Sequence, residues 1–319
     1  MEEVVKATGT EAHYVCPDVE SLFPALERIT WHQDEPFGST SIYAQWRVFE
    51  LAAGSRVKVM LDGQGADEQL AGYANYFAAR FGSLFRHLQW ARLAREIATT
   101  SRLHGRPLLW SMKQLANNLL PEVLRQPLRR LAGEAGAATP WLDMERLGAA
   151  PRDPFLASGV ARARSVRDMS CSQLSTASLP MLLHWEDRDS MAHSIEARVP
   201  FLDYRLVEFV LGLPDELKIA DGTTKRVLRE GMRGSLPERV RNRVDKMGFV
   251  TPEEVWLREQ STDRFRAALA AAIDASGGII RRDVMSRMEA MVTGREPFSF
   301  VPWRCISFGV WLNVFGIRT

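Results

Sequence analysis

The 319-residue sequence lacks the features that mark several broad classes of protein. It has no uncharged apolar run of about 18 residues, so no membrane span is expected. Lys and Arg (41) nearly balance Asp and Glu (39), and the formal net charge of +2 is too small to indicate a nucleic-acid partner. Met1 to Lys6 do not form a basic start followed by an apolar core, which argues against a secretory signal peptide.

Cysteine is also scarce, and its three copies, Cys16, Cys171 and Cys305, lie far apart. Their spacing matches no metal site, and no loop around them indicates a nucleophile. The sequence therefore predicts free thiols in a reducing, cytoplasmic compartment. There is no internal repeat and no low-complexity tail, and the length allows about two globular domains.

The most informative stretch is VKVMLDGQGADEQLAGY, residues 57–73. Its first part, Val57 to Leu61, is rich in β-branched residues and predicts a buried parallel strand. Gly63 and Gly65 then interrupt the apolar run, and glycine tolerates both positive φ and the close approach of a ligand. A helix is predicted from Ala66 onward. Because ligands of open α/β sheets bind at such strand ends, this turn is the first candidate site.

The same turn contains three acidic residues, Asp62, Asp67 and Glu68. A helix start suits an anion, but these carboxylates would repel bare phosphate. A hard cation such as Mg²⁺ would have to bridge a carboxylate to phosphate oxygens. Taken alone, the pattern is equally compatible with a tight strand–helix connection whose acids are solvated.

Helix and strand patterns alternate along the front of the chain. Residues 13–16 predict a strand, and Asp18 or Ser21 can cap a helix over Leu22–Trp31. A second helix is predicted over residues 42–53. This alternation predicts a parallel sheet with helices outside it.

The rest of the chain has a helical pattern. From about residue 74 to 170 the sequence predicts helices without a convincing strand, and its arginines are interleaved with Glu and aliphatic residues. That mixture favours solvated helix faces over an RNA-binding surface. Aromatic and aliphatic residues of Phe300–Phe315 recur at helical spacing and predict a core helix.

Three separated blocks of the sequence resemble one family. They are DEPFGSTS with VKVMLDGQGADEQLAGY, then EDRDSMAHSIEARVPFLDYRLVEFVLGLP, then GTTKRVLREGMRGSLPERVRNRVDKMGF. Their content, order and spacing resemble the synthetase domain of the glutamine-dependent asparagine synthetases, over essentially the whole chain. The same domain occurs in β-lactam synthetases, lasso-peptide cyclases and other amidotransferases.

The resemblance implies an α/β fold whose parallel-sheet, nucleotide-binding layer is of the ATP-pyrophosphatase (adenine nucleotide α-hydrolase-like) type. A large, mostly helical remainder would complete it. Within an asparagine-synthetase-type domain over 1–319, we expect a residual α/β part (1–73), a helical insertion (74–170) and a helical C-terminal part (171–319). The last part would provide substrate and pyrophosphate contacts.

The implied chemistry is ATP-dependent amide formation with ATP and Mg²⁺ as cofactors. Aspartate and ATP would give β-aspartyl-AMP and pyrophosphate, and glutamine-derived ammonia would then give asparagine and AMP. Adenylation places negative charge on the leaving pyrophosphate, which calls for a metal ion and positioned cations.

The resemblance also assigns roles to individual residues. Asp67 matches the second acid of the family's SGEGxDE turn and would bind Mg²⁺. Lys246 matches the lysine that stabilises charge at the reacting acyl phosphate. A guanidinium fork can hold a carboxylate or phosphate, which gives Arg188 a catalytic role and Arg198 a substrate-binding role, although structural ion pairs remain an alternative. The other expected contacts are Asp62, Gly63 and Gly65 to the nucleotide and Glu68 to the substrate.

The sequence departs from the family in three places. The pyrophosphatase loop SGGxDS, expected before Met1, is absent, so the resemblance is to an N-terminally truncated domain. The glutaminase domain with its terminal cysteine nucleophile is absent too, so a missing segment would supply the ammonia. Gln64, placed among the catalytic positions, stands where better-studied members have a Glu implicated in handling the amine, and an amide cannot act as a base.

Three functions stay open at this point. The chain could belong to an asparagine-forming enzyme, or to a related amidotransferase or cyclase of β-lactam or lasso-peptide type that activates another carboxylate. It could also be an inactive fragment, a pseudoenzyme or an interaction half that pairs with a separate front piece. Specificity depends on the shape of the pocket, which the sequence does not show.

Overall fold

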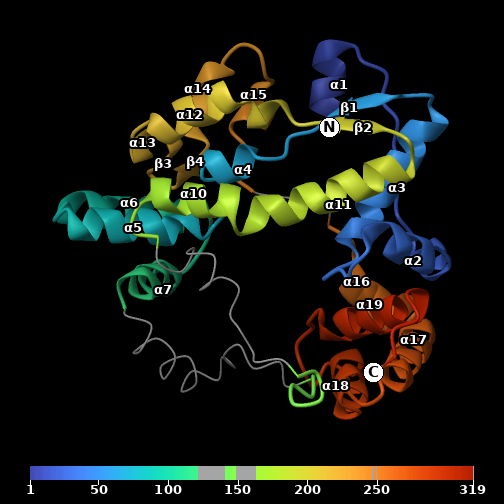
Figure 1. Ribbon diagram of the computed structural model, residues 1–319. Helices are drawn as coiled ribbons and strands as arrows, with labels where there is room; N and C mark the ends of the chain where they lie inside the picture. Colours follow the sequence, from blue (N-terminus) through green and yellow to red (C-terminus); the bar gives the residue numbers. More distant parts are fainter. Residues whose placement is uncertain (121–140, 149–162, 246–247, 249, 319) are drawn as a thin grey trace.

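The computed structural model describes residues 1–120, 141–148, 163–245, 248 and 250–318. This part of the chain is mostly helical and contains two small sheets (Figure 1). Its strands are β1 (Val59–Leu61), β2 (Glu196–Arg198), β3 (Ile219–Ala220) and β4 (Thr223–Thr224). Its helices are α1 (Glu2–Thr8), α2 (Val19–Gln33), α3 (Ser41–Gly54), α4 (Ala66–Gln69), α5 (Tyr76–Arg86), α6 (Trp90–Leu103), α7 (Leu108–Leu119), α10 (Val166–Ser175), α11 (Ser178–Ala192), η2 (Pro200–Leu202), α12 (Tyr204–Gly212), α13 (Asp215–Lys218), α14 (Arg226–Gly231), α15 (Glu238–Arg241), α16 (Glu253–Val255), η3 (Trp256–Gln260), α17 (Thr262–Ala275), α18 (Asp283–Val292) and α19 (Val301–Val314).

Strands β1 and β2 form the small parallel sheet beside the candidate turn. The backbone N–H of Asp62 extends their pairing by donating to the carbonyl of Arg198 at 2.8 Å. The predicted parallel strand is thus confirmed, but its predicted burial is wrong, because Val57, Val59 and Leu61 are 37%, 39% and 73% exposed. The reason is that β2 is the only strand paired with β1 among the described residues, which leaves the other edge of β1 uncovered.

The first two long helices follow the sequence predictions closely. Asp18 caps α2, and its side chain accepts a hydrogen bond from the Ser21 N–H at 2.8 Å. The predicted helix over 42–53 is confirmed as α3. The strand predicted over residues 13–16 is wrong, since that segment pairs with no neighbouring strand and has no regular structure.

Two hydrophobic cores stabilise the described part of the chain. In one, α2 and α3 pack with η3 and α17–α19, around buried Trp46 and Trp303. Trp303 lies in α19, which confirms the predicted core helix. The other core joins α5–α7 with α10 and β3. Helix α11 packs on α2 and α3 as well as on α10, and it crosses the middle of Figure 1 before the chain enters β2.

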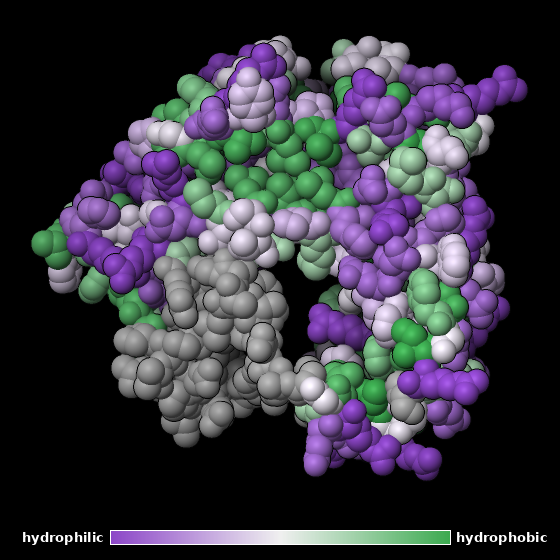
Figure 2. Space-filling model, viewed as in Figure 1, coloured by the Kyte–Doolittle hydropathy of each residue, from purple (hydrophilic) through white to green (hydrophobic). Residues whose placement is uncertain are grey.

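Some surfaces of this arrangement are apolar. On the face shown in Figure 2, apolar side chains gather around α12, where Leu206 and Phe209 are exposed. No described helix is both long and apolar enough to cross a bilayer.

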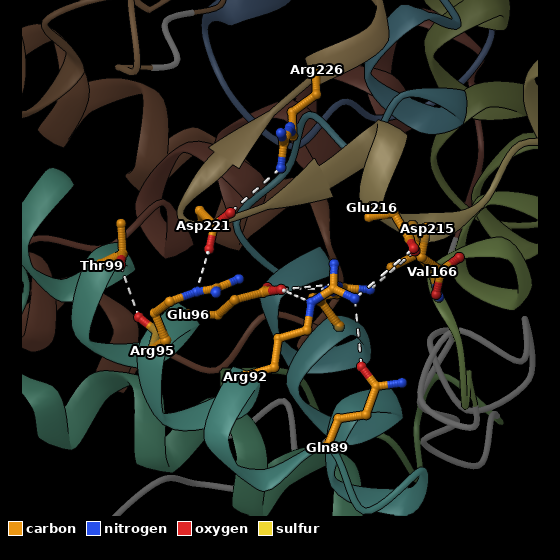
Figure 3. Close-up of polar contacts among 11 residues, drawn as sticks. Gln89, Arg92, Arg95, Glu96, Thr99, Val166, Asp215, Glu216, Asp221 and Arg226 are labelled. Carbon is orange, nitrogen blue, oxygen red and sulfur yellow. Dashed lines mark hydrogen bonds and ion pairs between the residues drawn. The ribbon is translucent and has the colours of Figure 1, made fainter.

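The arginines of α5 and α6 form an ion-pair network with Glu96 of α6, with Glu216 of α13 and with Asp221 in the turn after β3 (Figure 3). Arg80 and Glu96 are both buried and form two hydrogen bonds, at 2.7 and 3.1 Å. Arg95 pairs at the surface with Asp221, which follows β3. The predicted solvated helix face therefore holds for Arg95 but not for Arg80, which joins α5 to α6 inside the protein.

Glu96→Gln should lower the free energy of unfolding by about 3 kcal/mol, because the buried guanidinium of Arg80 would keep only the partly exposed Glu216, 3.8 Å away, as a counter-charge. Arg95→Gln is the matched control and should cost less than about 1 kcal/mol, since it breaks an exposed pair. Urea denaturation of the two variants measures the difference. Equal, small effects would contradict a stabilising role for the buried pair.

Candidate active site

The turn after β1 has the geometry of a ligand-binding turn. The Asp62 carboxylate accepts a hydrogen bond from the Gln64 N–H at 3.1 Å. Gly65 has a φ of 86°, and a Cβ at this position would lie 2.1 Å from Cδ2 of Leu202, so only glycine fits. A Cβ on Gly63 would meet no atom within 4 Å. The space above Gly63 is therefore open, as the approach of a ligand requires.

Asp67 forms an ion pair with Lys225. Nζ of Lys225 lies 2.6 Å from Oδ1 of Asp67, and both side chains are partly buried. Gly72 makes room for this pair, because a Cβ there would lie 1.8 Å from the same Asp67 oxygen. Lys225 also has a φ of 55°, a left-handed conformation that is uncommon for a residue other than glycine. Its GTTKRVLR segment was part of the family resemblance, but Lys225 itself was missed by sequence reasoning.

The Asp67–Lys225 pair lines a basic cavity of about 590 Å³. Burial, followed by repulsion from nearby Arg241, lowers the pKa of Arg229 in its wall. Lys246 lies outside the described residues, but Val244 and Asp245 just before it line the cavity. The cationic side chains of the described wall are Arg106, Lys225, Arg229, Arg241 and Arg243.

Glu68 lies beneath the turn rather than on its surface. Its side chain is buried and accepts hydrogen bonds from the hydroxyls of Tyr73, at 2.5 Å, and Ser178, at 3.1 Å. Burial, together with the hydrogen bond to Glu68, raises the pKa of Tyr73 far above its ordinary value. These contacts hold α4 against the start of α11, and a contact between Glu68 and a substrate remains a proposal.

The two predicted arginines form ion pairs away from the cavity. Nη2 of Arg188 lies 2.8 Å from Oδ2 of Asp34, at the end of α2. Nε of Arg198 lies 2.8 Å from Oε1 of Glu196 on the same exposed strand. Neither arginine lines the described wall of the 590 Å³ cavity. The structure therefore brings Asp67 to the cavity and leaves the roles of Arg188 and Arg198 as proposals.

Glu186 is a second residue that sequence reasoning missed. It lies on α11 and is only 2% exposed, yet neither carboxylate oxygen has a hydrogen-bond partner among the described residues. Burial, and then the nearby carboxylate of Asp62, raise its pKa to about 7, while the Gln64 amide partly offsets the rise. It opens the EDRDSMAHSIEARVPFLD block of the family resemblance, but its proximity to the turn depends on the packing of α11 and was not predicted.

The side chains of the cavity are compatible with a Mg²⁺ ion that is coordinated mainly by substrate phosphates and water. No cluster of three or more His, Cys, Asp or Glu side chains able to hold a metal occurs in the described ranges. Mg²⁺ commonly takes one or two carboxylates and completes its coordination with water and substrate phosphates. The Asp67 carboxylate on the wall of a cationic cavity fits that requirement.

The fold and site define a mostly helical α/β protein with a ligand-type turn at the end of a parallel strand and a basic cavity beside it. The asparagine synthase family model matches residues 1–313, and the chain belongs to this family. The predicted resemblance is therefore confirmed.

Three relatives illustrate the extent of the similarity. Asparagine synthetase (glutamine-hydrolyzing) 1 of Bacillus subtilis (strain 168) is 26% identical over 98% of this chain and 49% of its own length. Asparagine synthetase (glutamine-hydrolyzing) 3 of the same organism is 30% identical over 75% of this chain and 34% of its own. A putative asparagine synthetase (glutamine-hydrolyzing) of Mycobacterium bovis is 26% identical over 98% and 48%. The chain thus spans about half the length, or less, of these curated relatives.

Proposed function

We propose that this chain activates the side-chain carboxylate of aspartate by adenylation and then forms asparagine with ammonia. The family supports ATP-dependent amide formation in general. In the proposed reaction a carboxylate oxygen attacks the α-phosphorus of ATP, and pyrophosphate leaves. Ammonia, derived from glutamine by a glutaminase segment outside this chain, then displaces AMP from β-aspartyl-AMP.

The observation that best supports this proposal is the Asp67–Lys225 pair on the wall of the basic cavity. Asp67 would hold Mg²⁺ once Lys225 gives up its present pairing with Oδ1 of Asp67, and the ion would neutralise phosphate charge when bound. Lys225, with Arg229 and Arg243, would attract the negative charge that develops on pyrophosphate. The cavity volume of about 590 Å³ also lies within the usual range for ligand pockets.

The other proposed roles belong to the turn after β1 and to residues of the family motifs. Asp62, Gly63 and Gly65 would contact the nucleotide at the open side of the turn. Lys246 would stabilise charge at the acyl phosphate, next to the cavity-lining residue Asp245. Glu68, Arg188 and Arg198 would position the carboxylate substrate, which for the two arginines requires exchange of their present acidic partners.

One observation favours a related enzyme that activates a different carboxylate. Gln64 replaces the Glu that handles ammonia in better-studied members, so the nucleophile of this chain could be an amine of another substrate. The second candidate is therefore an amidotransferase or cyclase of β-lactam or lasso-peptide type.

A substrate panel tests both candidates. The natural protein would receive ATP, Mg²⁺ and ammonium with aspartate, glutamate or peptides with acidic side chains. Pyrophosphate release should be fastest with aspartate. Release that requires a peptide carboxylate would favour the second candidate, and carboxylate-independent release would contradict both.

A further inference from the structure

The carboxylate of Glu186 is an unexplained buried group that interacts with residues of the turn. A buried polar group without a hydrogen-bond partner is costly, so proteins retain few of them. Glu186 is 2% exposed, and neither of its oxygens has a partner at normal hydrogen-bond geometry in the described part of the chain, although the Gln64 amide is close enough to favour its charge. Most buried carboxylates here are held by neighbours, as Glu253 is by the backbone and hydroxyl of Thr40. Glu186 therefore has free acceptor capacity for a ligand.

The fold places this carboxylate at the end of β1. Helix α11 packs directly on β2, and β2 pairs with β1. Asp62, the residue after β1, is close enough to disfavour a charge on Glu186, while the Gln64 amide favours that charge. No charged group of α2, α3, α10 or β2 contributes to the shift among the described residues. Glu186, on α11, thus lies close enough to the turn to interact with the side chains of Asp62 and Gln64.

We infer that Glu186 is the proton acceptor for the amine that attacks the activated acyl group. The inference rests on the proposed function and adds a catalytic residue to it. Gln64 cannot accept this proton, because a neutral amide is a very weak base. Glu186 supplies, from a helix distant in sequence, the carboxylate that position 64 lacks.

The proton transfer balances with the proposed reaction. The lone pair of the amine forms the new C–N bond, and the C–O bond to AMP breaks, with its electron pair leaving on AMP. The attacking nitrogen then holds one proton too many for an amide. This proton passes to an oxygen of Glu186, which becomes a neutral carboxylic acid and later returns the proton to solvent.

The surroundings of Glu186 match this role. Burial and the Asp62 carboxylate raise its pKa to about 7, near the pH at which a general base is most effective. Above that pH the carboxylate is ionised and accepts a proton, and below it the group is already protonated. The amide-forming step should therefore slow as the pH falls through about 7.

Glu186→Gln tests the inference in the full-length natural protein. In a single turnover, amide formation should fall about 10²-fold, while pyrophosphate formation stays within about twofold of wild type. With free ammonia held constant, the amide-forming rate of the wild type should rise to a plateau with a midpoint near pH 7. The variant should lose this rise.

Asp189→Asn is the matched control. It makes the equivalent change at another buried carboxyl of α11, three residues further on, whose partner is Gln33 rather than the turn. Both rates should stay at wild-type values. Unchanged amide formation in Glu186→Gln, or an equal fall in both of its rates, would overturn the inference. Absence of pyrophosphate formation in the wild type would instead contradict the proposed function itself.

Discussion

Asp67→Asn should lower pyrophosphate release about 10³-fold, the largest catalytic effect that we expect. The substitution removes the formal charge that would bind Mg²⁺, and several kcal/mol of phosphate-charge stabilisation would be lost with it. It also leaves Lys225 without its carboxylate partner. Single-turnover pyrophosphate formation, measured with saturating ATP and aspartate, reports the change without interference from the amide-forming step.

Asp221→Asn is the control for this variant. Asp221 is also paired with cations, Arg95 and Arg226, but it lines a different cavity, of about 320 Å³. Its substitution should leave pyrophosphate formation near the wild-type rate. Retained pyrophosphate formation in Asp67→Asn would remove Asp67 from the metal site, and an equal loss in both variants would indicate a general effect of charge.

Asp189→Asn should change the pH dependence of stability by several kcal/mol. Asp189 is fully buried, and burial raises its pKa to about 8. Its Oδ1 accepts from Nε2 of Gln33 at 2.7 Å, while Oδ2 and the Gln33 Oε1 have no partner among the described residues. A protonated Asp189, or an Asn in its place, carries no buried charge at this position.

The sign follows from the raised pKa. Between about pH 4 and pH 8 the folded protein retains the Asp189 proton and the unfolded chain releases it. The contribution of Asp189 to the unfolding free energy therefore falls by about 1.4 kcal/mol for each pH unit through this window, or roughly 6 kcal/mol in total. Asp189→Asn should match the wild type near pH 4 and be more stable near pH 8.

Urea denaturation of the purified protein at pH 5 and pH 8 measures this effect. Asp187→Asn, at an exposed carboxyl of the same helix, should keep the wild-type difference between the two pH values. If Asp189→Asn keeps it too, Asp189 is ionised in the folded protein, which contradicts the raised pKa.

Local features of the fold were predictable from sequence. The strand, the turn and the start of α4 follow one another within residues 57–73, so propensity and glycine placement were enough to locate them. Asp18 was correctly among the predicted caps for the same reason. The burial of β1 was not predictable, because burial depends on how many neighbouring strands cover an apolar run.

Long-range partners account for most of what the sequence did not show. Lys225 and Glu186 lie far along the chain from the turn and reach it only through the packing of α14 and α11. The arginine pairs with Asp34 and Glu196 likewise depend on which acid the fold places nearby. The role of Lys246 rests on the family motif and stays a prediction.

Transfer of ¹⁸O is the most direct test of carboxylate adenylation by this protein. Aspartate labelled with ¹⁸O in its side-chain carboxylate would be converted by the full-length natural protein with ATP and ammonium, and the products would be analysed by ³¹P NMR and mass spectrometry. We predict one labelled AMP and one unlabelled pyrophosphate for each asparagine formed. Formation of ADP with labelled inorganic phosphate would show attack at the γ-phosphorus instead and would contradict adenylation.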